Sequence, residues 1–163
     1  MVISQNYCER IVQLALDDFS SDVLVPCSDG IDRTASEVMF CLCESVRQGH
    51  ADDLPCLLRI ARCAEDSEVM LQVGELYLYG QGVESSAEEA YAWFLRASHA
   101  GSAEAMARVG WMLLVGIGVA KNVRLAVDWL LLAAEEGYRP AQDFLIKVTS
   151  RALANAAAQL PSP

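Results

Sequence analysis

The residues of this sequence whose types and spacing could carry out chemistry are Cys27 and Arg33, separated by five residues and followed by Thr34. A cysteine thiolate is a nucleophile, and an arginine can hold a phosphate group with paired hydrogen bonds. Backbone amides in the intervening loop add donors for the same anion if the loop runs into a helix N-terminus. The spacing therefore makes Cys27, Asp29, Gly30, Arg33 and Thr34 candidate anion-binding residues.

Residues 23–35 resemble the active-site loop of myotubularin-type phosphoinositide phosphatases, which use a cysteine and an arginine at this spacing. The resemblance implies that Cys27 is the nucleophile, that Arg33 binds the phosphate, and that Asp29 or Asp32 is the acid. It gives an alternative function for the protein, as a phosphate- or phosphoinositide-binding protein or a small cysteine-dependent phosphatase.

Two departures from that loop favour a non-catalytic interpretation. Pro26 stands where the phosphatase family has histidine, and Ile31 replaces an aromatic residue. Catalysis would also need a central strand among parallel strands to hold the amides in place, whereas only residues 22–25 read as a strand. We therefore expect no enzymatic activity and interpret residues 20–33 as a loop between helices.

The six cysteines all lie in the first 63 residues, at positions 8, 27, 41, 43, 56 and 63. The sequence has no C-x-x-C motif and only two histidines, so no metal site is predicted. Cys56 and Cys63 would share a helix face about 10 Å apart, too far for a disulfide. Apart from Cys27, we expect reduced, buried thiols that pack as small hydrophobic groups.

Composition limits the classes of partner. Twelve Lys and Arg against 22 Asp and Glu give a net charge of −10, and such an acidic surface repels nucleic acid. No apolar run reaches the roughly 20 residues of a membrane span, and no secretory signal is visible at the N-terminus. Without a Walker or dinucleotide-binding loop, no cofactor is predicted. The expected location is cytoplasmic.

The second half of the chain repeats itself with a period of 36 residues. Aligning residues 67–105 with 103–141 gives 14 identities in 39 positions. A period of this length is typical of a solenoid in which each unit packs on its neighbours. Each unit reads as two helices, and Trp93 and Trp129 occur at the same place in the second one. Both tryptophans are expected in the core.

Small residues recur inside these units. Gly74 and Gly110 lie in the middle of predicted helices, where glycine costs about 1 kcal/mol against alanine, so a close helix approach must offset that cost. The order of small and aromatic residues resembles Sel1-like repeats. The residues that carry the resemblance are Gly74, Gly80, Gly82, Ala90, Trp93, Ala97 and Gly101, with identical residues 36 positions later.

The resemblance implies an all-α fold, a right-handed α-solenoid of Sel1-like helix-turn-helix repeats. It also implies a bacterial adaptor or regulator that binds another protein without catalysis, including partners associated with secreted effectors or toxins. We expect helices at residues 4–19, 34–47, 53–64, 67–79, 87–99, 103–115, 123–136 and 140–158.

The predicted organisation has four parts. Residues 1–66 hold the N-terminal helices, a degenerate capping repeat and the 20–33 loop. Residues 67–102 and 103–138 are Sel1-like repeats, and residues 139–163 are a C-terminal capping helix and tail.

The partner-binding surface is expected along the first helices of the repeats, centred on Trp111. This residue aligns with Glu75 of the preceding repeat, and a position that is charged in one repeat is rarely core in the other. The alternative is that Trp111 packs against the second helix of its own repeat or the next first helix. The predicted partner-binding residues are Gln72, Glu75, Tyr79, Arg108, Trp111 and Lys147.

Overall fold

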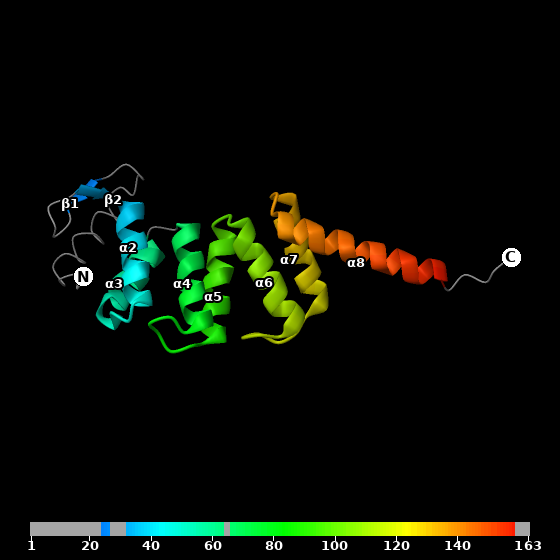
Figure 1. Cartoon of the computed structure of the whole chain (residues 1–163), viewed down its shortest axis with the longest axis horizontal. Coiled ribbons are helices and arrows are strands. Elements are labelled where there is room, and N and C mark those ends of the chain that lie inside the picture. The colour runs from blue at the N-terminus through cyan, green and yellow to red at the C-terminus, as the bar shows by residue number, and fades with distance from the viewer. Residues whose placement is uncertain (1–23, 27–31, 64–65, 159–163) are drawn as a thin grey trace.

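The structure, a computed structural model, describes residues 24–26, 32–63 and 66–158. These residues form seven α-helices, a short 3-10 helix and two strands (Figure 1). In chain order they are β1 Leu24–Pro26, β2 Asp32–Thr34, α2 Ala35–Arg47, η1 Ala51–Asp53, α3 Leu54–Cys63, α4 Ser67–Tyr79, α5 Ala87–His99, α6 Ala103–Val115, α7 Val123–Glu135 and α8 Arg139–Ala158. The helix predicted at residues 4–19 lies outside the described residues.

The helices stand side by side in an extended array, which is the predicted all-α solenoid (Figure 1). Helices α4 and α6 are the first helices of the two repeats, and α5 and α7 are the second. The bounds of α4, α5 and α6 agree with the predicted ranges. No helix among the described residues is both long and apolar enough to cross a membrane.

Polar caps start the repeat helices. The Ser86 hydroxyl accepts a hydrogen bond from the Glu89 amide (3.2 Å) at the start of α5. Ser102 and Asn122 cap α6 and α7 in the same way. The first helices end at Gly80, whose φ of 65° is left-handed, and at the equivalent Gly116. These local signals fix where each helix begins and ends.

The two mid-helix glycines lie where the helices of one repeat touch. A Cβ atom on Gly74 would lie 2.5 Å from Phe94 of α5, and one on Gly110 would lie 2.8 Å from Leu130 of α7. Any larger residue would push the second helix away from the first. The close approach inferred from the sequence is therefore confirmed.

Each repeat also rests on the unit before it through its internal turn. A Cβ atom on Gly82 would collide with the Val46 carbonyl oxygen at the end of α2, and one on Gly118 with the Ala87 carbonyl oxygen at the start of α5. Both glycines also have positive φ angles. The contacts join successive units into one stack.

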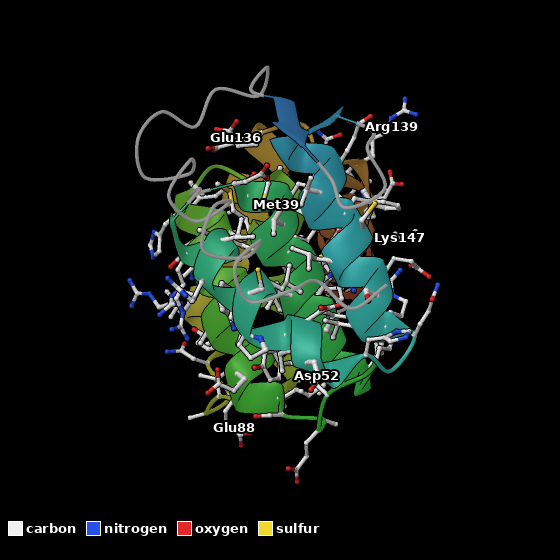
Figure 2. The ribbon with its side chains drawn as sticks, turned by 90° about the vertical axis from the view of Figure 1, so that its left-hand side faces the viewer. Met39, Asp52, Glu88, Glu136, Arg139 and Lys147 are labelled. Carbon is white, nitrogen blue, oxygen red and sulfur yellow. The ribbon has the colours of Figure 1, made fainter. Side chains whose placement is uncertain are left out.

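The main core runs through α2 to α7 and contains Met39, which points inward from α2 in Figure 2. Trp93 is 2% exposed and belongs to this core, as predicted. Trp129 is only partly buried, and its ring meets the exposed His99 edge-on with the ring centroids 5.9 Å apart. The expectation that both tryptophans are core residues is therefore wrong for Trp129.

A short hairpin precedes α2. Strands β1 and β2 pair antiparallel, with Leu24 opposite Thr34, Val25 opposite Arg33 and Pro26 opposite Asp32. The expectation of a loop over residues 20–33 and of a helix from residue 34 is therefore wrong for the residues of β1 and β2. Backbone pairing between the two strands decides the conformation of residues 32–34, whose three side chains are polar.

The cysteines differ from one another. Cys41 and Cys43 are free, the first exposed and the second buried, whereas Cys56 is disulfide-bonded to a cysteine outside the described side chains. The expectation of reduced, buried thiols is therefore wrong for Cys56, which is oxidised, and for Cys41, which is exposed. Since disulfides persist in oxidising compartments, the cysteines give no support to a cytoplasmic location.

Candidate partner-binding surface

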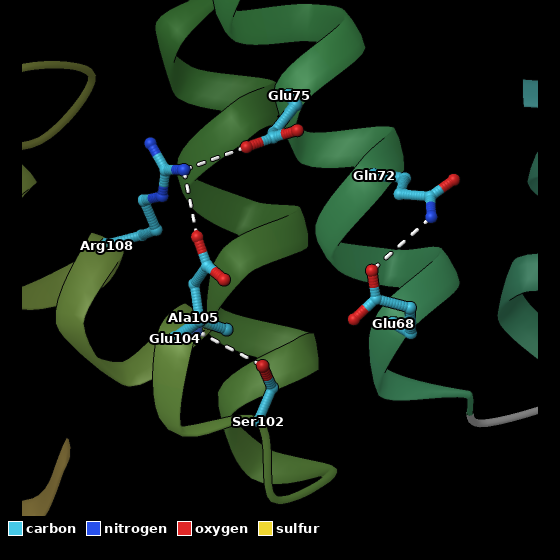
Figure 3. A network of polar contacts seen from close by, with 7 residues as sticks. All are labelled: Glu68, Gln72, Glu75, Ser102, Glu104, Ala105 and Arg108. Carbon is cyan, nitrogen blue, oxygen red and sulfur yellow. Dashed lines mark hydrogen bonds and ion pairs between the residues drawn. The ribbon is translucent and has the colours of Figure 1, made fainter. Parts of the chain in front are cut away.

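The surface of the first helices is organised around Arg108 on α6. Its Nη2 atom donates to Glu75 Oε1 on α4 (2.9 Å) and to Glu104 Oε1 on its own helix (3.0 Å), as Figure 3 shows. Tyr79, in the last turn of α4, lies near enough to Arg108 to contribute to the rise in its pKa. One arginine therefore joins the first helices of both repeats.

The same spacing recurs in the preceding repeat with a neutral side chain. Gln72 lies one period before Arg108, and its Nε2 atom donates to Glu68 Oε1 (3.4 Å) four residues back (Figure 3). The longer side chain and positive charge of Arg108 let it reach the neighbouring helix as well.

The charges around Arg108 are unbalanced. Burial lowers the pKa of Arg108, but hydrogen bonds to Glu104 and Tyr79 and the charges of both glutamates outweigh burial and raise it above its usual value. The formal charges of Arg108, Glu75 and Glu104 sum to −1, so an acidic group of a partner would gain little electrostatic energy here. Arg108 Nε is buried without a hydrogen-bond partner. The cluster is suited to orienting side chains rather than to binding an anion.

Trp111 lies one turn further along α6 and is half-buried. It packs on a second core cluster that includes Leu130 and Ala141, and its ring tilts against Tyr138 with centroids 6.3 Å apart. Trp111 is thus partly exposed, as expected, and it also packs against the helices that follow it, which was the alternative.

The other predicted partner-binding residues lie at different places. Glu75 and Gln72 are partly exposed on α4, and Tyr79 is 58% exposed. Lys147 is exposed on α8, away from the Arg108 cluster, and points outward in Figure 2. The structure therefore brings Glu75, Tyr79 and Arg108 together and leaves Lys147 apart.

Two residues near Arg108, Glu104 and Tyr138, were not among the predicted partner-binding residues. Glu104 accepts a hydrogen bond from Arg108. Burial, and after it the negative charge of Glu104, raises the pKa of Tyr138 above its usual value. The signal for Glu104 was available, because Glu68 and Glu104 are identical residues one period apart, each four residues before a polar donor. Tyr138 has no aromatic counterpart in the preceding repeat, so its role depends on packing.

The predicted anion site is described only in part. Cys27, Asp29 and Gly30 lie outside the described residues, and for Arg33 and Thr34 the backbone alone is described, in β2. Arg33 pairs with Val25 across an antiparallel hairpin, rather than standing at the N-terminus of α2. No parallel strand accompanies the hairpin within the described part of the chain.

Two neighbouring aspartates before α3 differ in their surroundings. Asp52 is exposed, whereas Asp53 is 1% exposed and accepts a hydrogen bond from the Ser45 hydroxyl (2.6 Å). Asp53 stands directly before the first residue of α3. Among the described residues, no group of three His, Cys, Asp or Glu side chains is suited to holding a metal ion.

Comparison with known proteins agrees with this geometry. The Sel1 repeat family model matches residues 67–102 and 103–138. No curated protein matches the chain. A Sel1 repeat protein from Oxalobacter formigenes is 29% identical with a TM-score of 0.59, over 70% of this chain and 36% of that one.

Two further solved structures share the fold. The c5321 protein, a protective antigen of uropathogenic Escherichia coli with an SLR fold, is 22% identical with a TM-score of 0.62, over 72% of this chain and 26% of that one. Helicobacter pylori cysteine rich protein B is 16% identical with a TM-score of 0.52, over 67% of this chain and 92% of that one. This chain spans only about a third and a quarter of the first two proteins.

Proteins built from Sel1 repeats are generally protein-interaction adaptors. The matched residues coincide with the two helix pairs α4–α5 and α6–α7 and with the Arg108 cluster that joins them. Residues 67–102 and 103–138 therefore match the Sel1 repeat, one helix pair to each match.

Proposed function

We propose that this protein is a non-catalytic adaptor that binds a partner polypeptide along the first helices α4, α6 and α8. The observation that carries the proposal is the group of aromatic and charged side chains on adjacent repeats formed by the exposed Tyr79 and the partly buried Arg108 and Trp111. Tyrosine, tryptophan and arginine are the residues that dominate binding energy at protein interfaces.

Preorganisation supports this assignment. Glu75 and Glu104 hold Arg108 in one orientation, and Tyr138 holds the Trp111 ring. A side chain that is already ordered loses little conformational entropy when a partner binds. Gln72 and Lys147 extend the surface on either side, and the partner class expected is the bacterial effector- or toxin-associated protein that the resemblance implies.

The test begins with a pull-down from the native host and identification of the bound protein by mass spectrometry. With that purified partner, Trp111→Ala is expected to weaken binding at least tenfold, about 1.4 kcal/mol, with the helical circular dichroism intact. Tyr79→Ala, at a more exposed position, is expected to weaken binding without touching the core. Unchanged affinity in both variants would place the binding surface elsewhere.

A matched control removes a side chain of similar exposure on another helix. Leu132 is 46% exposed on α7, a second helix. Leu132→Ala is expected to leave partner affinity within about twofold of wild type. A loss equal to that of Trp111→Ala would show that the first helices are not the binding surface.

A further inference from the structure

Trp93 of α5 contacts two arginine side chains that come from neighbouring units. The Arg62 guanidinium of α3 lies 5.8 Å from the centre of the Trp93 ring, and the Arg96 guanidinium of α5 lies 5.0 Å from it. A guanidinium over an indole is attracted by the electrons of the ring. Because Trp93 is only 2% exposed, while both arginines are exposed, the buried ring supports two positive charges at the surface.

The two guanidiniums place like charges close together. Their distances to the shared ring add up so that the two Cζ atoms lie within about 11 Å of each other. Burial, and after it the charge of Glu89, raises the pKa of Tyr77, and Arg62 opposes this, so Glu89 is the acidic side chain that acts on the same group as Arg62. Neither arginine forms an ion pair with Glu89 or with any other residue that the structure describes.

Arg59 extends the positive charge along α3. It stands three residues before Arg62, so the two side chains are neighbours on one face of the helix, and both are exposed. Helix α3 contains no acidic residue. On α5 both acidic residues lie in the first turn, whereas Arg96 lies in the last. We name Arg59, Arg62 and Arg96 the arginine patch.

The arginine patch belongs to α3 and α5 and does not continue onto the next second helix. One period after Arg96, α7 has Leu132, and one period after His99 it has Glu135. The whole chain has a net charge of −10. The patch is therefore a local positive surface on an acidic protein, which favours an acidic partner at this place.

We propose that the arginine patch binds an acidic segment of a partner polypeptide, at a surface separate from that of the first helices. A guanidinium binds a carboxylate with two parallel hydrogen bonds. Alternate side chains of an extended segment lie on one side about 7 Å apart, so successive carboxylates can meet neighbouring guanidiniums. A long nucleic acid or an anionic membrane would also meet the acidic remainder of the chain, which repels it. A short acidic segment avoids that repulsion.

The first experiment measures binding of a short labelled peptide, in which glutamates alternate with serines, to the whole chain by fluorescence anisotropy. At low salt, wild type is expected to bind this peptide at least tenfold tighter than the same peptide with glutamine for glutamate. Arg62→Gln combined with Arg96→Gln is expected to weaken binding of the acidic peptide at least tenfold. Circular dichroism verifies that the variant is folded. The absence of saturable binding to wild type would overturn the proposal.

A control variant with the same change in net charge separates the patch from the overall field of the protein. Lys121→Gln combined with Arg124→Gln removes two exposed positive charges, one before α7 and one in its first turn. Neither residue forms an ion pair within the described part of the chain. The control is expected to bind the acidic peptide within about twofold of wild type, and a loss equal to that of the patch variant would overturn the proposal.

Competition distinguishes a polypeptide from other anions. Inorganic phosphate and vesicles that contain phosphatidylserine are expected to displace the labelled peptide no better than sodium chloride of the same ionic strength. The unlabelled acidic peptide is expected to displace it fully. Displacement by phosphate or by vesicles at a lower concentration than the unlabelled peptide requires would contradict the assignment to a polypeptide.

Cross-linking locates the bound peptide. The chain has two lysines, Lys121 and Lys147, and neither belongs to the arginine patch. Arg96→Lys retains the positive charge and adds an amine to the patch, and a carbodiimide joins an amine to a nearby carboxylate as an amide. Mass spectrometry is expected to find the peptide attached at position 96 in preference to the two native lysines. Attachment at the native lysines and none at position 96 would overturn the proposal.

Discussion

Arg108 of α6 forms an ion pair with Glu75 of α4 across the boundary between the two repeats, with 2.9 Å between Nη2 and Oε1. Both side chains are about one-quarter exposed, so solvent screens the pair in part. Because the two first helices meet here, the ion pair fixes the relative position of the surfaces to which we assign partner binding.

The Arg108–Glu75 pair is expected to contribute about 0.5–1 kcal/mol to the free energy of unfolding. A double-mutant cycle with Arg108→Ala, Glu75→Ala and the double variant measures this coupling by urea denaturation. The coupling is expected to fall at high salt, since the pair is partly exposed. A cycle that shows no coupling at low salt would contradict the role given to the pair.

Gly74→Ala is expected to lower the free energy of unfolding by about 1–3 kcal/mol, although alanine is the better helix former. The added methyl group would meet Phe94, which lies 2.5 Å from the Cβ position. Phe94→Leu is the matched second change, because the smaller side chain leaves room for the methyl group. The loss in the double variant should be smaller than the sum of the two single losses, and additive losses would argue against the contact.

Trp93→Ala and Trp129→Ala are expected to differ in their cost. Trp93 is 2% exposed and should cost about 3–5 kcal/mol, whereas the partly buried Trp129 should cost about half as much. Urea midpoints for the two variants, measured side by side, give the comparison. Equal losses would show that Trp129 has a core role that its exposure does not reveal.

Cys43 is expected to resist alkylation in the folded protein, while the exposed Cys41 reacts. Burial raises the pKa of the Cys43 thiol to about 12, against the partial opposition of Arg47, so almost no thiolate exists at pH 8. Mass spectrometry of iodoacetamide-treated protein measures both sites, with urea-unfolded protein as the positive control. Rapid modification of Cys43 under native conditions would be inconsistent with this placement.

The same pKa shift predicts a change in stability with pH. The folded state favours the protonated thiol of Cys43. Its contribution to the free energy of unfolding is therefore complete below about pH 9, the ordinary pKa of a cysteine. That contribution is lost as the pH rises from about 9 towards 12, the pKa of the thiol in the folded state. Cys43→Ala should therefore flatten the decline of the urea midpoint over this range, and an unchanged decline would rule out Cys43 as its source.

We expect the wild-type protein to hydrolyse neither a phosphoinositide nor an aryl phosphate. Cys27→Ser should therefore behave like wild type in the same assay. The physical reason is that Arg33 lies in an antiparallel hairpin without parallel strands beside it in the described chain. Release of inorganic phosphate measures the activity, and Cys41→Ser serves as a control. Turnover that disappears only in Cys27→Ser would establish a phosphatase.

The repeat architecture follows from signals in the sequence. The caps at Ser86 and Ser102 and the left-handed glycines Gly80 and Gly116 act within a few residues, so they need no tertiary information. The 36-residue period identifies the equivalent helices, and Gly74 and Gly110 mark a close approach between the helices of each repeat.

Tertiary packing sets which equivalent positions are alike in their surroundings. Trp93 and Trp129 are the same residue at the same place in the repeat, yet Trp93 is buried and Trp129 only partly buried against the core. Likewise the bond from Arg108 to Glu75 joins residues 33 positions apart, and the pairing of Arg33 with Val25 gives a strand where the sequence shows none. Burial and long-range pairing depend on what the neighbouring units supply, and a period in the sequence does not contain that information.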